Sequence, residues 1–391
     1  MSYEGNGVSI AGGLLKNPGP PVEYDGMLKV EVAGKGFTAV GGYSRPSDQL
    51  GEYTSLFIFV ALPITLGGPP CFFVTGLGGG AGINRRLIPP EITEVPNFVL
   101  VAAIDDSTFA NNPMAALKNM ATNIPARRGS YWFAAGVRFD SFVLVHSIAV
   151  IYVALDKGFE IGLLGVSRMA LPTADLAIVS VELALKARFS TAEGILSIQA
   201  QLTDNSYLFS KACQLTGGFA FFTWFPKGQF VISIGGYHPA FQRPPEFPTV
   251  PRVGFRWAVS DAIVIKGEAY FALTNTAVMA GGRLEASAHL GPVRAWFIVY
   301  ADFLISWDPF YYDIAIGVEV GVALDFEICF FVCGHVHIEV SIGADLHIMG
   351  PPLHGTVTVK VLFISVTIPF GPSGPPQPDY IESFSVFQKS T

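Results

Sequence analysis

The clearest pattern in the chain is a two-residue alternation between positions 314 and 342. Every even position there carries a large apolar residue, with the single exception of Gly334. The odd positions are small or polar, and Phe331 is the one large apolar residue among them. A repeat of two is the side-chain period of a pleated strand. We therefore predict strand here, with the even positions facing a core and the odd positions facing solvent.

This stretch is too long for one ordinary strand. At about 3.3 Å per residue it would span roughly 95 Å, and strands rarely exceed about ten residues. We predict two or three consecutive antiparallel strands that keep the same face buried.

Short strand-like runs separated by glycine and proline fill most of the remaining sequence. The apolar run at 97–104 is one more strand candidate. Alternation at 177–202 predicts an amphipathic hairpin, although a helix over 174–188 is an alternative. The βαβ alternation that accompanies a parallel sheet is absent from the pattern. The fold class predicted is all-β and mainly antiparallel, a long curled or sandwich-like meander.

One short helix is predicted at 112–123. Asn112 can cap it, Pro113 fits its first turn, and good helix formers follow until Pro125. We expect this helix to pack on the end of a sheet.

A Pro-rich segment at 243–252 divides the chain, because proline cannot join a ladder and favours extended backbone. We predict a flexible N-terminal segment at 1–22 and a first β-rich part, with the helix, at 23–242. After the linker at 243–252 comes a second β-rich part at 253–371, which either continues the first sheet or stands apart. A flexible tail is predicted at 372–391.

The composition is unusually apolar. Hydrophobic residues make up 50% of the chain and charged residues only 14%, against about 25% charged in ordinary soluble proteins. Such a chain buries much apolar surface or shields it within an assembly. The net charge of −7 and the lack of any basic run argue against nucleic acid as a partner.

Targeting and crosslinking signals are weak. The four cysteines have no framework spacing. We see no signal peptide, so the compartment is left undetermined. The longest uncharged segment, between Glu52 and Arg85, is interrupted by Pro63, Pro69 and Pro70. We therefore expect no transmembrane helix.

The glycine-rich run at 76–82 has the spacing of a dinucleotide fingerprint in Gly76, Gly78 and Ala81. That motif needs a helix N-terminus to hold the pyrophosphate, and Pro89 and Pro90 prevent such a helix from continuing. We predict instead a turn or a close backbone approach that glycine permits.

Three residues of one strand face, Cys333, His335 and His337, are of the types that bind zinc. Cys329 and Glu339 share their parity. Ligands in line on one strand cannot surround a tetrahedral ion, so we expect a polar outer face and no metal. These three residues are the weak candidates if a metal binds.

Aromatic and carboxylate side chains gather at 307–313 (WDPFYYD), as they do in sugar sites. Asp308 followed by Pro309 is also an ordinary turn opener, and a turn is the prediction. Tyr237 and His238 follow two glycines, and we predict a turn there as well. With no recognised catalytic motif elsewhere, we lean towards a protein that is not an enzyme and has no cofactor.

Strings at 67–87, 215–225, 230–241, 253–287 and 301–313 resemble the domain-of-unknown-function family 6603. The resemblance covers roughly residues 25 to 371. It implies a β-rich part of a large microbial protein, and it brings no established catalytic residues.

The leading functional hypothesis is a non-enzymatic structural or interaction module, whose partners are other domains of a larger protein. One alternative is a binder of hydrophobic ligands, such as lipids, in a groove of a curled sheet. Another is an outer-membrane-like β-barrel, against which the missing signal and the Pro-rich segment count. For the groove we predict these lining residues: Phe219, Phe221, Phe230, Phe271, Trp296, Phe297 and Tyr300.

Overall fold

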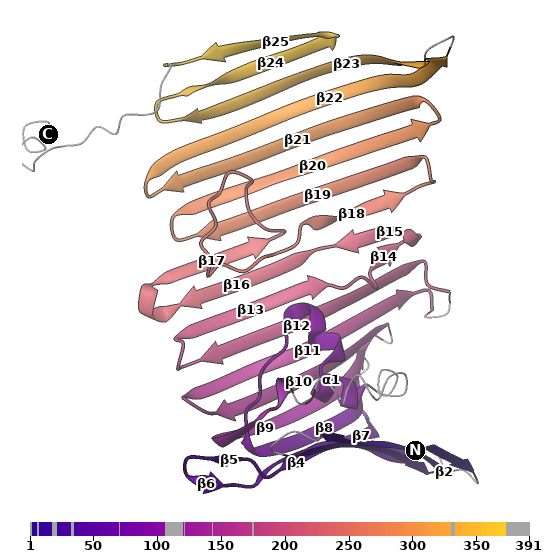
Figure 1. The fold of residues 1–391 in the computed structure, drawn as a ribbon, viewed down its shortest axis with the longest axis vertical. Helices are drawn as coiled ribbons and strands as arrows, with labels where there is room; N and C mark the ends of the chain where they lie inside the picture. Colours follow the sequence, from indigo (N-terminus) through magenta and orange to yellow (C-terminus); the bar gives the residue numbers. More distant parts are fainter. Residues whose placement is uncertain are drawn as a thin grey trace, which may run out of the picture. The chain divides into compact units, whose positions relative to one another are not determined.

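The computed structural model describes residues 2–5, 8–17, 22–32, 35–69, 71–105, 120, 122–142, 144–173, 176–329 and 333–372. These residues form mainly antiparallel strands (Figure 1), which confirms the predicted fold class. The chain divides into two compact units. The first unit is Met1–Gly236 with Pro244–Trp257, and the second is Tyr237–Arg243 with Ala258–Thr391.

The first unit is a meander in which each strand pairs antiparallel with its neighbour in the sheet. The ladder runs β1-β2-β3-β4-β7-β8-β9-β10-β11-β12-β13-β16-β17, while β14 pairs with β12 and β15, and β15 pairs with β18. Its strands are β1 (Ser2–Gly5), β2 (Val8–Asn17), β3 (Glu23–Val32), β4 (Lys35–Ser44), β5 (Ser47–Asp48), β6 (Gly51–Glu52), β7 (Ser55–Leu66), β8 (Phe72–Arg85), β9 (Ala126–Ser141), β10 (Val145–Leu155), β11 (Phe159–Leu171), β12 (Val179–Ser190), β13 (Ile195–Leu202), β14 (Tyr207–Leu208), β15 (Ser210–Thr216), β16 (Gly218–Trp224), β17 (Gln229–Ile234) and β18 (Val253–Ala258).

Short helices cover one face of this sheet. The 3-10 helix η1 (Ile92–Asn97) leads into α1 (Val99–Ile104), and α1 packs on β4 and on β7 to β11. All six residues of α1 are buried, in one core with Phe57, Trp132, Tyr152 and Leu164 of the sheet. Another 3-10 helix, η2 (Phe225–Lys227), links β16 to β17.

The second unit is a series of hairpins. Its strands are β19 (Ile263–Thr274), β20 (Ala277–Leu290), β21 (Val293–Trp307), β22 (Phe310–Cys329), β23 (Cys333–Gly350), β24 (His354–Leu362) and β25 (Ile364–Phe370), each antiparallel to the next. The described residues of the alternating stretch at 314–342 fall in β22 and β23. The prediction of consecutive antiparallel strands is therefore confirmed, with strands of 20 and 18 residues that exceed the usual length.

The prediction of which side of β22 and β23 is buried was wrong. Val320 and Ile342, at even positions, are 49% and 57% exposed, whereas Ala323 is fully buried. Alternation reports that two faces differ, but the burial of either depends on what packs against it. Here aromatic rings of β21 cover Gly317 and Gly321 on the odd side, and the described residues of this unit place no second layer on the even side.

The apolar run at 97–104 was also assigned to the wrong element, because it forms the end of η1 and α1 rather than a strand. The run lacks alternation, and a short helix that is apolar all round is stable where it is buried on every side. The hairpin at 177–202 is confirmed as β12 and β13, whose register runs from Leu183↔Leu202 to Ser190↔Ile195. The helical alternative there was wrong.

Other predicted segments are only partly described. Most of the helix at 112–123 lies outside the described residues, and Met120, Thr122 and Asn123 at its end are helical. Strands β1 and β2 lie within the segment expected to be flexible. The Pro-rich segment packs on the first unit, where Phe247 stacks on Trp224 at 5.5 Å between ring centroids. All but the first residue of the tail lies outside the described residues. No helix in the described part of the chain has the length and apolar character needed to cross a bilayer.

Candidate functional site: an uncharged sheet face in each unit

One face of the sheet in the second unit carries no charged side chain. Because side chains alternate along a strand, the register places Phe297, Val320, Ile342 and Val361 in one row of this face. The described side chains on the same side of the paired segments of β19 to β25 are apolar, or glycine, except for Tyr312. We call this the uncharged face of the second unit. Its aliphatic side chains are widely exposed.

The first unit has a face of the same kind, on the side of the sheet opposite α1. One of its rows contains Ile58, Phe133 and Ile161. From β7 to β13, the paired segments bring no charged side chain to this side. Two of its few polar groups, Ser147 and Ser167, hydrogen-bond to each other at 2.9 Å. We call this side of the sheet, which continues over β4, β3 and β2 and carries the single described charged group Lys16 on β2, the uncharged face of the first unit.

A hollow of about 910 Å³ opens on the uncharged face of the first unit. Gly26 and Gly41 lie opposite each other in its floor, in a row that ends in Leu14 on β2 and Ile58 on β7. The missing side chains of the glycines create the space. The adjacent rows that wall it carry Tyr24 and Tyr43 on one side and Leu28 and Ala39 on the other.

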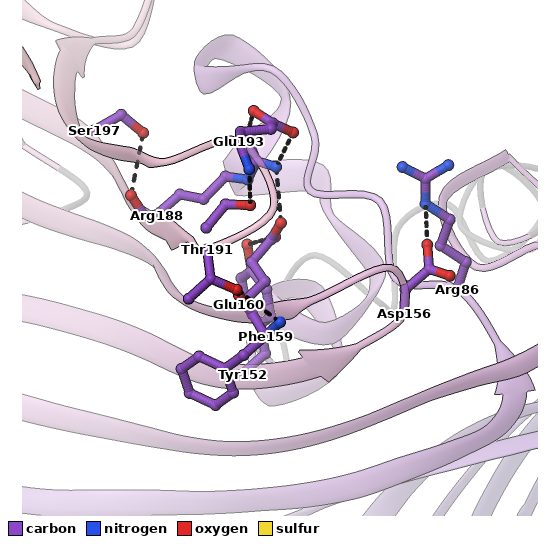
Figure 2. A network of polar contacts seen from close by, with 10 residues as sticks. Arg86, Tyr152, Asp156, Phe159, Glu160, Arg188, Thr191, Glu193 and Ser197 are labelled. Carbon is purple, nitrogen blue, oxygen red and sulfur yellow. Dashed lines mark hydrogen bonds and ion pairs between the residues drawn. The ribbon is translucent and has the colours of Figure 1, made fainter. Parts of the chain in front are cut away.

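The opposite face of the first unit is rich in charged groups, and these are paired. Arg188 lies between two carboxylates, with 2.8 Å to Glu160 and 2.6 and 2.8 Å to the two oxygens of Glu193 (Figure 2). The Tyr152 hydroxyl donates to Glu160 at 2.9 Å. Hydrogen bonds from Arg188 lower the pKa of Glu193, and burial together with Glu160 raises the pKa of Tyr152. The network joins β10, β11 and β12.

A second charged cluster on this face ties α1 to the sheet. Arg168 on β11 pairs with Asp105, directly after α1, and with Glu182 on β12 at 2.5 Å. Burial alone would raise the pKa of Glu182, but hydrogen bonds from Arg168, Thr203 and Asn205 outweigh burial and lower it.

Burial lowers the pKa of Lys186, a property that catalytic lysines share. It lines a cavity of about 460 Å³ together with Glu160 and Arg188. Its Nζ, however, donates to the Pro90 carbonyl at 2.6 Å, which fastens the segment before η1 to β12. We interpret Lys186 as a structural anchor.

The residues predicted to line a groove do not share one face. Phe219, Phe221 and Phe230 lie on the uncharged face of the first unit. Phe271 and Phe297 lie on the uncharged face of the second unit, at 40% and 38% exposure. Trp296 and Tyr300 lie on the opposite, polar face.

Trp296 and Tyr300 have structural surroundings. The Trp296 indole donates to Glu319 at 3.0 Å, and its ring covers Gly321. The Tyr300 ring covers Gly317, and its hydroxyl donates to Asp345. The two rings explain why Gly317 and Gly321 are buried.

Of the weak metal candidates, His335 and His337 are described on the polar face, while the side chain of Cys333 lies outside the described ones. His337 pairs with Asp325 and, at 3.4 Å, with Glu339. The hydrogen bond with Asp325 raises the pKa of His337. Within the described ranges, no group of three or more His, Cys, Asp or Glu residues is arranged to hold a metal ion.

The other motifs have simple structural explanations. The glycine run at 76–82 lies in β8, where a Cβ at Gly78 would come within 3.0 Å of Phe59 and Ile104, so the predicted close approach is confirmed. Asp308 and Pro309 form the turn between β21 and β22, as predicted. His238 is buried beside Tyr270, at 6.4 Å between ring centroids.

Sequence reasoning missed the hollow and the continuity of the uncharged faces. The signal for the faces was present in the alternation of each strand. Recognising the hollow requires the register, because Gly26 and Gly41 become neighbours only when β3 pairs with β4.

Comparison with known proteins places the chain in a family. It belongs to the family of unknown function DUF6603, whose model matches residues 1–391. No curated protein and no solved structure matches the chain.

Proposed function

We propose that this protein binds lipids, holding their acyl chains against the uncharged faces of its two units. The observation that carries the proposal is that the described side chains on one side of β19 to β25 include no charged group, while the aliphatic residues there remain exposed. Exposed apolar patches beyond a few hundred Å² mark interaction sites.

The chemistry of these faces fits an acyl chain better than a protein. Protein interfaces are on average only about 56–65% apolar and make roughly one hydrogen bond per 100–200 Å². A methylene chain requires no hydrogen bonds, and each buried CH₂ contributes about 0.8 kcal/mol. A face with almost no polar group satisfies an acyl chain and leaves the polar groups of a protein partner unpaired.

Aromatic residues gather at one end of the uncharged face of the second unit. Trp307 and Phe310, beside the β21–β22 turn, are 47% and 59% exposed, and Phe310 lies 6.1 Å from the Tyr312 ring centroid. Trp and Tyr concentrate where aliphatic lipid meets its polar headgroups. This end is therefore suited to the headgroup end of a bound lipid.

The test is to identify and count the lipid that co-purifies with the full chain. Organic extracts of purified protein are analysed by mass spectrometry for wild type and for the triple variant Val318→Asp, Val320→Asp and Val322→Asp. These three valines are exposed on one strand, so the variant is expected to fold. Its matched control, Glu319→Gln with Asp325→Asn, changes the opposite face of the same strand.

We expect wild type and control to carry about one or more acyl-containing molecules per chain, and the triple variant to lose most of them. Wild-type protein free of acyl-containing molecules would overturn the proposal. Equal lipid content in the triple variant and the control would do so too.

A structural or interaction module is the second candidate, supported by the edge strand β25. Among the described residues of its unit β25 pairs only with β24, and residues 364–369 are exposed. An open edge can accept a strand from a partner. If edge pairing is the function, sedimentation will show self- or partner association that Thr367→Lys weakens, with the lipid content unchanged.

A further inference from the structure

The hollow on the uncharged face of the first unit differs from the rest of that face in shape and in charge. Its volume of about 910 Å³ lies within the range of about 300–1,000 Å³ typical of small-molecule sites. Side chains from β2, β3, β4 and β7 line it, and the lining is almost entirely apolar. The hollow is open to solvent on its outer side, so a ligand can enter it directly.

The width of the hollow suits a single chain. Side chains on one face of a strand repeat about every 7 Å, so the row of Gly26 and Gly41 is flanked at that distance by Tyr24 and Tyr43 on one side. Leu28 and Ala39 bound it on the other. The row crosses four strands, about 14 Å at 4.7–4.9 Å between strands. The glycines lower the floor on the two inner strands, and Leu14 and Ile58 stand at its ends, so a single acyl chain that lies along the row can contact both glycines and both of these side chains.

One cation stands at the rim. Lys16 is the residue of β2 opposite Tyr24, and its Nζ lies 5.8 Å from the centroid of the Tyr24 ring, which lines the hollow. Lys16 is the one charged residue on this face among the described side chains. This holds for the paired segments of β2 to β4 and of β7 to β13. It is exposed, so an anionic headgroup can reach it from solvent.

We propose that the hollow binds a single-chain anionic amphiphile of the fatty-acid class, with its chain over Gly26 and Gly41 and its carboxylate beside Lys16. This inference rests on the proposed lipid-binding function and names one site and one ligand class for it.

The probes are dodecanoate and its uncharged analogue dodecanol, titrated into the delipidated full chain by calorimetry. The key variant is Gly26→Leu, which fills the furrow. A Cβ at Gly26 meets Leu14 Cδ1 at 3.5 Å, an ordinary contact, so the first atom of the new side chain fits, and the remaining carbons extend into the open hollow. The matched control is Gly79→Leu, on the same face outside the hollow, where a Cβ meets nothing nearer than the Ala134 carbonyl at 3.8 Å.

We expect Gly26→Leu to weaken dodecanoate binding at least about tenfold, because the buried methylenes lose their site, and Gly79→Leu to bind like wild type. Lys16→Gln should weaken dodecanoate about twofold to fivefold, the effect of one exposed charge pair, and leave dodecanol unchanged. Circular dichroism and thermal melts verify that each variant is folded.

Unchanged dodecanoate affinity in folded Gly26→Leu would overturn the site, and so would an equal loss in Gly79→Leu. An unchanged ratio of dodecanoate to dodecanol affinity in Lys16→Gln would overturn the role of the cation. These failures are distinguishable from failure of the proposed function, because the lipid extracted from cells is tested separately through the valine variants of β22.

Discussion

The two units differ in what lies on the sheet face opposite the uncharged one. In the first unit α1 covers that face, and large side chains such as Trp132 and Tyr152 are buried beneath it. On the corresponding face of the second unit the rings of Trp296 and Tyr300 lie over glycines of β22, and a small cluster that includes Met279 and Leu304 is buried. The uncharged face is the feature that both units share. The two units are therefore stabilised by different packing on one side of the sheet. The proposed lipid contact uses the same kind of surface, the uncharged face, in both.

The largest expected effect lies in the core under α1. Trp132→Ala should lower the free energy of unfolding of the first unit by about 3–5 kcal/mol, the usual cost of emptying a large aromatic site. Phe133→Ala, the next residue along and 58% exposed on the uncharged face, should cost below about 1 kcal/mol. Urea denaturation compares the two. Similar losses would mean that both faces are covered.

Acidity should act through the covered face, where Asp25 is fully buried. Burial and the neighbouring Glu23 raise its pKa to about 6, against the opposing effect of Arg85. The folded state thus favours the protonated acid. The contribution of protonated Asp25 to the free energy of unfolding is therefore complete below about pH 4, and it is lost as the pH rises through 6.

Asp25→Asn should therefore be more stable than wild type at pH 8, by up to about 3 kcal/mol for a rise of two pH units in the pKa. The difference should vanish at pH 4. Asp48→Asn is the control of opposite sign, because the hydrogen bond from Arg128 lowers the pKa of Asp48. Denaturation curves at the two pH values settle the sign, and a pH-independent gain in Asp25→Asn would contradict this account.

On the polar face of the second unit, a methyl group at Gly321 should displace a ring. Gly321→Ala would overlap Trp296 and break its hydrogen bond to Glu319, at a cost of about 1–3 kcal/mol from overpacking. Gly79→Ala, which has open space in the first unit, should be nearly neutral. Thermal melts that follow Trp fluorescence measure both, and a neutral Gly321→Ala would show that the ring does not cover the glycine.

The smallest effect on stability is expected at the uncharged face itself. Val320→Asp should fold and cost about 1 kcal/mol, the difference in strand propensity, rather than the several kcal/mol of a buried charge. Glu319→Lys should cost at least as much, because it removes the partner of Trp296 and of Lys360, which lies 2.5 Å away. Loss of soluble protein in Val320→Asp alone would restore the original expectation that Val320 faces a core.

Much of the fold was predictable from local pattern. Period two identified β22 and β23, and glycine and proline marked the ends of many other strands. Alternation could also have separated Trp296 from Phe297, since adjacent strand residues point to opposite faces. Placing both in one groove ignored that rule.

The remainder depends on long-range packing. Val320 is exposed and Gly321 is buried because the Trp296 ring of β21 lies over Gly321, which the sequence of β22 does not reveal. The α1 run is apolar on all sides, so its sequence pattern does not distinguish a helix from a strand. Gly26 and Gly41 form one floor only through the register of β3 and β4.

The most direct test of lipid contact is the environment of each residue from 316 to 324 in lipid-loaded protein. Nitroxide labels are placed one at a time on β22, after the native cysteines have been replaced by serine. Their accessibility to oxygen, which partitions into acyl chains, is compared with accessibility to a polar nickel complex. The account predicts a two-residue oscillation, with oxygen accessibility highest at Val318, Val320 and Val322 and the nickel complex excluded there. High accessibility of those same positions to the nickel complex would contradict it, because the uncharged face would then be open to water rather than covered by lipid.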